Sequence, residues 1–342
     1  MSCGHGGHYG EPVTGVTVFG AGAMGTAFAM HAARRGLKTT LWANEFDSRA
    51  LESIRRDGRH PLLTEHLPAG LRVCGPDELA EAAEGCEVAV LAANSHGARS
   101  LAGMVVGVVS EATSVISVAK GLETSTGKRI SEVYAEELPR ATIIGIGGPC
   151  LATELAEGLP CAAVWASATV EEARGAGAPF EHSSYQISYT DDLAGVEYCP
   201  MMKNVAAIGL GMLDGIGKPT GEDFKNAKAA LFTKAAQELA TLVITLGGQV
   251  ETALGLAGLG DALVTSLGGR NRLYGELVGA GNPPEATLEE MEARGMTVEG
   301  VDSTRDVRRL AQQHVLDLPY HLAIHRVLFE GADPRDVLEV LR

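Results

Sequence analysis

The sequence predicts an α/β domain with a mostly parallel sheet, followed by an all-α domain. Three observations support this prediction. Short apolar runs alternate with segments of helical periodicity up to about residue 190, and strand patterns disappear after about residue 195. The length of 342 residues also suits two domains. We therefore expect a disordered tail over 1–13, a first domain over 14–194 and a helical domain over 195–342.

The first domain opens with a strand over 14–20, then a helix from Met24 to Arg35 that ends at Gly36, then a strand over 38–43. A glycine directly after the last periodic residue is typical of a helix end. A helix is expected over 77–85. The further expected strands are 87–93, 113–119, 141–148 and 161–167. These runs are apolar on both faces, which indicates a parallel sheet covered by helices on both sides.

The second domain shows only helical periodicity. Helices are expected over 203–217, 225–248, 303–315 and 333–342. The stretch 279–287 contains two prolines and two glycines, so we expect it to be a surface loop. Strands followed by helices alone predict an α/β region and an all-α region that pack as separate layers.

Composition excludes several classes of protein. The net charge of −15 provides no overall field that would attract nucleic acid or an anionic membrane. No run of about 18 apolar residues occurs, so no membrane span is expected. The six cysteines are scattered without C-x-x-C spacing, which suggests reduced thiols and a cytoplasmic location. Cys3, His5 and His8 could ligate a metal, but a glycine-rich tail without a metal is the favoured interpretation.

The strongest local motif is G-x-G-x-x-G at 20–25, directly after a strand and at the start of a helix. Its first glycine allows the tight turn, its second lets a pyrophosphate approach, and its third lets helix and strand pack closely. The motif therefore predicts a Rossmann-type dinucleotide-binding domain. The residues expected to bind the cofactor there are Gly20, Gly22, Ala23, Met24 and Gly25.

An acidic residue about 20 positions after the motif commonly binds the ribose hydroxyls of NAD. Glu45 has that spacing, with a solvated loop charge as the alternative. The segment after the second strand contains Asn44, Glu45 and Asp47, and no cation before Arg49. A carboxylate repels the 2′-phosphate of NADP, so NAD is the expected cofactor, with NADP as the alternative.

Four charged residues stand alone in apolar or glycine-rich surroundings. Lys120 follows a strand, at the edge where ligands bind in open α/β sheets. Lys203 and Asp261 lie in apolar helical segments, and Arg270 follows two glycines. A buried lysine needs a partner. Each also has a structural explanation: Lys203 as a surface lysine lying along apolar surface, Asp261 as a helix N-cap, and Arg270 as a solvated charge.

Seven segments of the chain carry a family resemblance. They are 20–27, 117–123, 147–162, 195–217, 226–235, 255–276 and 296–307. In these segments, and in their order, the sequence resembles the NAD(P)-dependent sn-glycerol-3-phosphate dehydrogenase family. The resemblance covers nearly the whole chain from about residue 14. It implies a cytoplasmic oxidoreductase that interconverts sn-glycerol 3-phosphate and dihydroxyacetone phosphate.

The resemblance also implies roles for individual residues. Lys203 matches the lysine that donates a proton to the substrate oxygen or accepts one from it, and Lys120 matches a second lysine of the same site. Asp261 matches the aspartate that pairs with the catalytic lysine. Asn204 and Thr265 match neighbours that contact the substrate.

Three further matches concern the phosphate and the cofactor. Arg270 and Asn271 match the pair that holds the substrate phosphate, and Arg270 also touches the cofactor. Glu299 matches a position that binds the ribose or diphosphate on the nicotinamide side. The expected partner is thus a small phosphorylated molecule, and a homodimer is compatible with this assignment.

The sequence departs from the family pattern at three places. Asn94-Ser95 replaces a Pro-Ser pair, Gly148-Pro149-Cys150-Leu151 replaces a Gly-Pro-Ser-aromatic motif, and the insert 218–225 replaces a shorter glycine-rich connection. We expect the first two to border the nicotinamide pocket and the third to lie at its rim. These departures leave open a paralogue that reduces another small phosphorylated or phosphonylated ketone. A non-catalytic NAD-binding sensor is the remaining alternative.

The residues themselves suit the implied chemistry. Reduction of a ketone needs a hydride and a proton, and the helical half offers no obvious histidine pair to supply that proton. A lysine can supply it if its pKa falls from about 10.4 toward neutrality. Lys120 near Lys203 would lower the pKa of the pair, whereas Asp261 would oppose that shift. Arg270 offers a planar fork for a phosphate.

Overall fold

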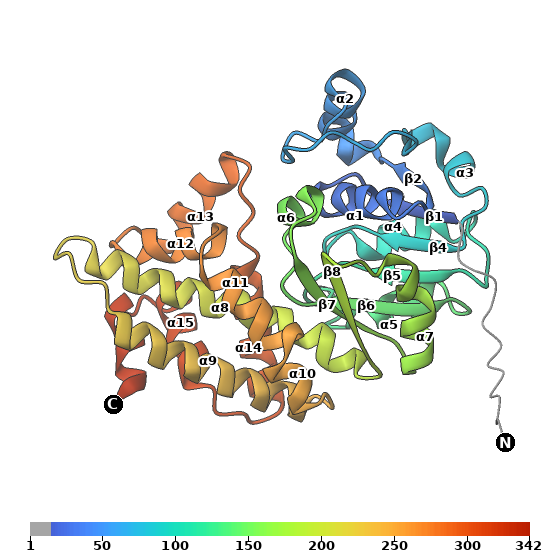
Figure 1. The fold of residues 1–342 in the computed structure, drawn as a ribbon. Helices are drawn as coiled ribbons and strands as arrows, with labels where there is room; N and C mark the ends of the chain where they lie inside the picture. The colour runs from blue at the N-terminus through green and yellow to red at the C-terminus, as the bar shows by residue number, and fades with distance from the viewer. Residues whose placement is uncertain (1–14) are drawn as a thin grey trace.

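The computed structural model describes residues 15–342, and Figure 1 shows an α/β region joined to a helical region. The expected tail, with Cys3, His5 and His8, lies outside the described residues. Every element up to Thr190 belongs to the α/β region, and only helices follow from Leu193 onward. The predicted fold class is confirmed.

The α/β region is built on one eight-stranded sheet. The strand order is β3-β2-β1-β4-β5-β6-β7-β8, and every neighbouring pair is parallel except β6 and β7. The strands are β1 (Gly15–Phe19), β2 (Lys38–Trp42), β3 (Arg72–Cys74), β4 (Val88–Leu91), β5 (Ser114–Ser117), β6 (Thr142–Gly147), β7 (Cys161–Ala166) and β8 (Tyr185–Thr190). Strands β3 and β8 were not predicted from the sequence. These are the two edge strands, and both are partly exposed, so neither shows the continuous apolar run of a buried strand.

Helices cover both faces of this sheet. They are α1 (Ala23–Arg34), α2 (Ser48–Asp57), α3 (Leu79–Ala82), α4 (Ala98–Val105), α5 (Ile130–Glu137), α6 (Ala152–Glu157) and α7 (Val170–Gly177). Val16 and Val18 of β1 point into the cluster formed with α1 and α6, whereas Phe19 points into the cluster formed with α4 and α5. Alternate side chains of one strand thus reach opposite faces.

The helical region contains α8 (Leu193–Gly217), α9 (Lys225–Thr245), α10 (Val250–Leu254), α11 (Asp261–Ser266), α12 (Arg270–Gly279), α13 (Pro284–Ala293), α14 (Glu299–Gln313) and α15 (Pro319–Phe329). Two expectations were wrong in part. The predicted loop over 279–287 is shorter, because α13 begins at Pro284, where a missing backbone N–H costs nothing. The final segment, Pro334–Leu341, is a 3₁₀ helix rather than an α-helix.

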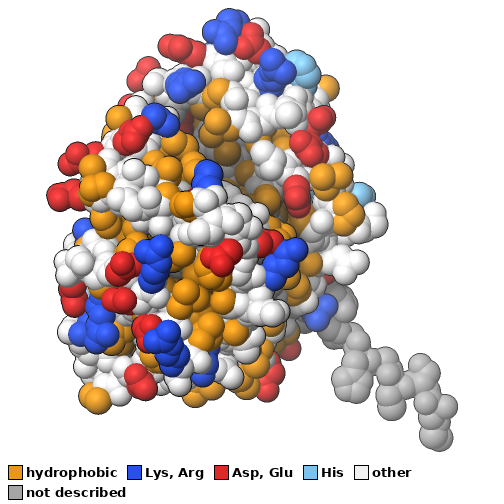
Figure 2. Space-filling model, turned by 90° about the vertical axis from the view of Figure 1, so that its left-hand side faces the viewer, with side chains coloured by type: hydrophobic (Ala, Val, Ile, Leu, Met, Phe, Trp, Pro, Cys, Tyr) orange, Lys and Arg blue, Asp and Glu red, His pale blue; other side chains and the backbone are white. Residues whose placement is uncertain are grey.

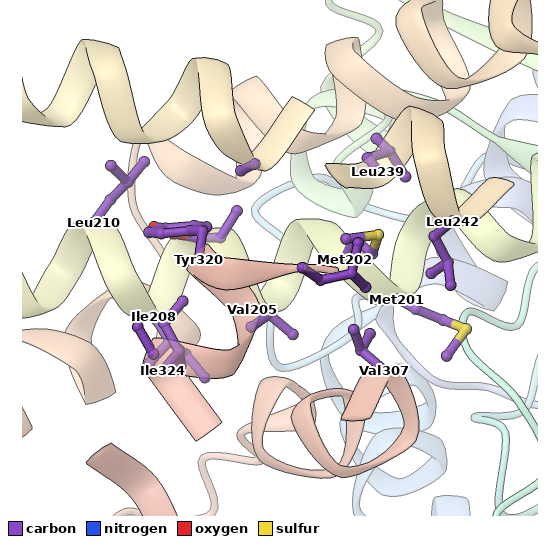
Figure 3. Close-up of a cluster of buried hydrophobic side chains, with 14 of the residues drawn as sticks. Met201, Met202, Val205, Ile208, Leu210, Leu239, Leu242, Val307, Tyr320 and Ile324 are labelled. Atoms are coloured by element: carbon purple, nitrogen blue, oxygen red, sulfur yellow. The ribbon is translucent and has the colours of Figure 1, made fainter. Parts of the chain in front are cut away.

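Helix α8 is the centre of the helical region. Figure 3 shows its side chains Met201, Met202, Val205, Ile208 and Leu210 among residues of the surrounding helices. Those neighbours are Leu239 and Leu242 of α9, Val307 of α14, and Tyr320 and Ile324 of α15. A helix that is apolar on all sides is stable only when neighbours cover it all round, as they do here.

Glycines let α8 and α12 approach until their backbones touch. A Cβ added to Gly211 would lie 2.1 Å from the carbonyl oxygen of Arg272, and one added to Gly275 would lie 2.0 Å from that of Ile208. Gly215 and Gly279 make equivalent contacts one turn further along. This contact fixes α12, and therefore its first residue Arg270, against α8.

The first prediction concerns this contact. We expect Gly275→Ala to lower the free energy of unfolding by about 1–3 kcal/mol or more, because the methyl group has no space and the helices must separate. The matched control is Gly103→Ala in α4, where an added Cβ meets nothing within 4 Å. That variant should gain up to about 1 kcal/mol, since alanine is the better helix former. Denaturant unfolding measures both, and equal stability of the two variants would contradict the contact.

The surface of the helical region carries charges of both signs. Figure 2 shows acidic and basic side chains interspersed over this face, with hydrophobic side chains between them. Within residues 15–342, no single helix is long and apolar enough to cross a membrane. Two consecutive helical segments, Val250–Ser266 and Arg270–Gly279, are long and apolar enough only when they are counted together, and a bend of 54° separates them.

Candidate functional site

A cleft of about 440 Å³ opens between the α/β region and the helical region. It begins where the strand order reverses between β1 and β4, the position where open α/β sheets bind ligands. Three loops at strand ends line one side, and α8, α12 and α14 line the other. The lining residues used below are Gly22, Ala23, Met24, Gly25, Asn94, Ser95, His96, Lys120, Met201, Asn204, Arg270, Glu299, Asp302 and Asp306.

The glycine loop has the geometry that a bound pyrophosphate needs. Gly20 has φ +111°, a conformation that disfavours side chains, and a Cβ on Gly25 would lie 2.2 Å from the carbonyl oxygen of Gly20. A Cβ on Gly22 would meet nothing within 4 Å, and Gly22 lines the cleft. No side chain caps α1, and its first residues Ala23 and Met24 line the cleft. These residues fit a dinucleotide.

The end of β2 presents a different carboxylate from the expected one. The Asp47 side chain accepts hydrogen bonds from the backbone N–H of Ala21 at 2.9 Å and of Asn44 at 3.2 Å. Glu45, the residue expected to bind the ribose, is exposed. His60, which is buried, also lies beside Ala21 and Asp47. The reciprocal side-chain capping between Asn44 and Asp47 turns Asp47 inward and leaves Glu45 outside.

Two lysines and one aspartate form an ionic cluster beside the cleft, and Lys120 is the member of the cluster that lines it. Lys203 Nζ donates to Asp261 Oδ1 at 2.7 Å, and Lys120 Nζ donates to Asp261 Oδ2 at 2.8 Å. Lys120 lines the cleft, whereas Lys203 is only 7% exposed and is not a surface lysine. The Asp261 side chain does not cap a helix, because both its oxygens are engaged by lysines.

The cluster shifts the pKa of each member. Burial and the neighbouring charge of Lys120 lower the pKa of Lys203 to about 7. Burial opposes the charge on Lys120, but Asp261 outweighs it and raises the pKa of Lys120. Burial would raise the pKa of Asp261, but the two ammonium groups outweigh it and lower that pKa. Lys203 is therefore the member of the cluster that can exchange a proton near neutral pH.

The other expected substrate residues lie around α8 and α12. Asn204 and Arg270 line the cleft, and Arg270 is exposed at the start of α12. Asn271 donates to Asn204 Oδ1 at 3.0 Å and accepts from the backbone N–H of Gly300 at 2.9 Å, so it ties α8, α12 and α14 together. Thr265 lies on α11, one turn after Asp261, and is not among the residues that line the cleft.

The three departures from the family pattern lie at different distances from the cleft. Asn94 and Ser95 line it, and Cys150 lines a small adjoining cavity together with Lys120 and Met24. The insert 218–225 was wrongly expected at the rim. It follows the distal end of α8, about 22 Å along the helix from Lys203 at about 1.5 Å per residue, and Figure 1 shows this connection to α9 at the outer tip of the helical region.

Several residues of the cleft were not identified from sequence. Asp302 and Asp306 of α14 line it beside Glu299, and His96 Nε2 lies 3.8 Å from Asp302 Oδ2 across the cleft. The repeat of acidic residues at 299, 302 and 306 has helical spacing, which could have placed them on one face. Within residues 15–342, no group of three His, Cys, Asp or Glu side chains could hold a metal ion.

Comparisons with known proteins cover both regions. A family model described as NAD-dependent glycerol-3-phosphate dehydrogenase N-terminus matches residues 15–173, and the model of the C-terminus of the same family matches 192–339. A glycerol-3-phosphate dehydrogenase [NAD(P)+] of Thermoanaerobacter sp. (strain X514) is 36% identical over 94% of this chain and 95% of the relative. One of Salinibacter ruber is 37% identical over 96% of this chain and 94% of the relative.

Solved structures agree with these sequence matches. The crystal structure of glycerol-3-phosphate dehydrogenase from Coxiella burnetii has a TM-score of 0.84 and 31% identity, and the match covers 96% of this chain and 99% of that one. A ketopantoate reductase of the PanE/ApbA family from Ralstonia eutropha shares the fold, with a TM-score of 0.60 at 14% identity, over 96% of this chain and 99% of that one.

Proposed function

The chain belongs to the NAD-dependent glycerol-3-phosphate dehydrogenase family, and from that membership we propose that it interconverts sn-glycerol 3-phosphate and dihydroxyacetone phosphate. It is an NAD(P)-dependent oxidoreductase with a Rossmann-type nucleotide-binding region. The observation that carries the proposal is the cluster of Lys120, Asp261 and Lys203, which reaches through Lys120 a cleft that the glycine loop and Arg270 also line.

The roles proposed for the site residues follow from their charges and positions. A bound nicotinamide supplies or accepts the hydride at the carbon that carries the reacting oxygen. Lys203 gives a proton to that oxygen during reduction and takes it back during oxidation, because its pKa is about 7. Asp261 orients the Lys203 amine, and Lys120 keeps a positive charge beside the developing alkoxide.

Arg270 is proposed to hold the substrate phosphate. Its guanidinium is exposed at the cleft and makes no ion pair with an Asp or Glu among the described residues, unlike Arg272, which pairs with Asp214 at 2.7 Å. A planar guanidinium can bind a phosphate through two parallel hydrogen bonds. The Asn271 bridge from Asn204 to Gly300 would then hold the start of α12 in place beneath that phosphate.

The proposed function is tested by following NADH absorbance after addition of dihydroxyacetone phosphate. We expect oxidation of NADH with this substrate, and little with unphosphorylated dihydroxyacetone. A panel of other phosphorylated and phosphonylated ketones tests the alternative that the protein is a paralogue with a different substrate, because such a paralogue would oxidise NADH fastest with one of them. NADH binding without turnover of any of these ketones would support the non-catalytic sensor and overturn the proposal.

The direction of the pH dependence is the second prediction. Because reduction needs protonated Lys203, kcat/KM for the ketone should be highest below pH 7 and fall by about tenfold per unit above it. Oxidation of the alcohol needs the neutral amine, so its kcat/KM should rise through the same pH. Profiles above about pH 6.5 keep the substrate phosphate largely dianionic. If kcat/KM changed with pH in the same sense for reduction and for oxidation, Lys203 would not be the group that exchanges the proton.

Cofactor preference is the third prediction. We expect a higher kcat/KM with NADH than with NADPH, because the Asp47 carboxylate bound to Ala21 would face the 2′-phosphate. Like charges brought together in this way cost several kcal/mol. Asp47→Asn should then reduce the preference, whereas the matched variant Glu45→Gln should leave it unchanged. If Glu45→Gln moved it instead, the sequence-based assignment of Glu45 to the ribose would be supported.

Location and assembly extend the proposal. All five described cysteines are free thiols, which supports a reducing compartment such as the cytoplasm. A homodimer is proposed as the assembly. Cell fractionation tests the location, and sedimentation at several concentrations tests the dimer, which a purely monomeric protein would contradict.

A further inference from the structure

The start of α8 joins the three segments that supply the ionic cluster. Lys203 lies on α8, Asp261 follows α10 along the chain, and Lys120 follows β5. These segments must meet at fixed distances, because both lysines contact the same carboxylate. Two buried acidic side chains near the start of α8, Asp192 and Glu197, make the contacts that join the segments.

Asp192 joins α8 to the segment that leads to Asp261. Its carboxylate accepts hydrogen bonds from the backbone N–H of Gly195 at 2.9 Å, in the first turn of α8, and of Gln249 at 2.8 Å, at the start of α10. Hydrogen bonds to a charged acceptor are stronger than those between neutral groups. This contact therefore fixes the segment of Asp261 to the helix that carries Lys203.

Glu197 joins α8 to the segment that carries Lys120. Its carboxylate accepts hydrogen bonds from the Ser131 backbone N–H at 2.7 Å and from the Ser131 hydroxyl. The guanidinium of Arg129 lies 3.6 Å from the same carboxylate. Ser131 and Arg129 lie at the amino end of α5, where the free N–H groups of a helix favour a negative charge.

Arg129 closes the turn that begins at Lys120. An isolated antiparallel bridge pairs Arg129 with Leu122, which is buried in the core of the helical region. A displacement of the amino end of α5 therefore reaches Lys120 through a short hydrogen-bonded turn. Glu197 does not line the cleft, and it lies about 9 Å along α8 from Lys203 at about 1.5 Å per residue.

We propose that Glu197 is a positioning residue that holds Lys120 against Asp261 by fixing the amino end of α5 to α8. Without this contact, the turn that carries Lys120 moves away from Asp261. Asp192 still keeps Lys203 beside Asp261, so Lys203 loses only a neighbouring positive charge. The developing alkoxide loses the charge of Lys120 as well. The effect on turnover rests on the proposed function, whereas the effect on the charge of Lys203 does not.

An amide can replace the carboxylate of Glu197. Burial raises the pKa of Glu197 to about 7, although Ser131 and Arg129 oppose this shift, so an uncharged group is tolerated there near neutral pH. Glu197→Gln keeps an oxygen that accepts from the Ser131 N–H, and the Ser131 hydroxyl can accept from the amide nitrogen. Glu197→Ala removes both contacts. The two variants therefore differ in whether α5 is held to α8.

The experiment follows the charge of Lys203 in protein that contains carbon-13-labelled lysine, through the chemical shift of its side chain against pH. The absence of one signal from Lys203→Ala identifies it. In Glu197→Ala the midpoint should rise by about 0.5–1, because Lys120 lowers the pKa of Lys203 and a charge about 4–6 Å away changes a pKa by about 1–3. Glu197→Gln should keep the midpoint of the unmodified protein.

Turnover is measured on the same variants. We expect kcat for dihydroxyacetone phosphate to fall by about tenfold or more in Glu197→Ala, since a misplacement of about 1 Å in a site can cost about 100-fold in rate. Glu197→Gln should retain most of kcat. A loss in Glu197→Gln as large as that in Glu197→Ala would contradict positioning through the Ser131 hydrogen bonds.

Glu238→Ala is the matched control for a general loss of stability. Glu238 is also buried, and it accepts from the backbone N–H of Tyr320 at 2.7 Å and of His321 at 3.1 Å, at the amino end of α15. It does not line the cleft. This variant should unfold at a lower temperature, as Glu197→Ala should, but it should keep kcat and the midpoint of Lys203. An equal fall of kcat in both variants would overturn the proposal.

An unchanged Lys203 midpoint in folded Glu197→Ala would also overturn it. If that variant failed to fold, Ser131→Ala would replace it, because this change removes only the hydroxyl donor. A smaller rise of the midpoint is then expected, and no rise would refute the role of Glu197. If the unmodified protein oxidised NADH with no ketone, the proposed function would fail, while the midpoint of Lys203 still decided the role of Glu197.

Discussion

Lys203→Ala is expected to lower kcat for dihydroxyacetone phosphate by about 10²–10⁴-fold, the usual contribution of a general acid. Lys203 is the member of the ionic cluster whose pKa is lowered to about 7, so its loss removes the group that can exchange a proton near neutral pH. The affinity for NADH should stay the same, because the substitution leaves the glycine loop and Asp47 unchanged. Steady-state kinetics and NADH titration measure the two effects.

The variant should still fold, because Asp261 keeps Lys120 as its partner at 2.8 Å. Lys234→Ala, at an exposed position of α9, serves as the control and should keep full activity. Small primary amines added to Lys203→Ala should partly restore turnover, which they would not do if the lysine were merely structural. Turnover equal to that of the unmodified enzyme would remove Lys203 from the mechanism.

Arg270→Ala is expected to raise KM for dihydroxyacetone phosphate by about 10- to 100-fold. Hydrogen bonds to charged groups contribute about 1.5–3 kcal/mol, and about 1.4 kcal/mol corresponds to a tenfold change in affinity. Arg270→Lys should recover only part of the loss, because an ammonium group cannot bind two phosphate oxygens in the fixed geometry of a guanidinium. Unphosphorylated dihydroxyacetone should react as slowly with the variant as with the unmodified enzyme.

Arg272 provides the contrast on the same helix. It pairs with Asp214 and does not line the cleft, so Arg272→Ala should lower the stability of the protein and change KM far less. Thermal unfolding separates the two cases. If Arg270→Ala impaired the phosphorylated and unphosphorylated substrates equally, Arg270 would be a structural arginine rather than a phosphate ligand.

Several features could be predicted from sequence because neighbouring residues alone produce them. The loop at 20–25 depends on a strand, a turn and a helix that follow one another, and the structure shows a local steric reason for Gly20 and Gly25. The buried strands β1, β4 and β5 also appeared as short runs rich in apolar residues, because both their faces are covered. The edge strands β3 and β8 lack that covering and went unrecognised.

The site itself depends on residues far apart in the chain. Lys120, Lys203 and Asp261 drew attention as isolated charges, and the family resemblance implied that Asp261 pairs with Lys203, but Asp261 lies 141 residues from Lys120 and 58 from Lys203. No local sequence pattern predicts that the carboxylate of Asp261 lies between the two ammonium groups. Nor does any local pattern predict that burial and the charge of Lys120 lower the pKa of Lys203. That arrangement exists only after α8 and α11 meet the carboxyl edge of the sheet.

The sequence by itself determined the fold class, the nucleotide-binding loop and the residue types of the site, since local sterics and hydrophobic periodicity act along the chain. Only the tertiary structure decided that Asp47 rather than Glu45 binds the glycine loop, because side-chain capping with Asn44 sets which carboxylate turns inward. The same holds for Gly211 and Gly275, whose role is to let two backbones touch. Such contacts depend on how separate elements approach each other in space, and the hydrophobic periodicity of one element does not indicate which element packs against it.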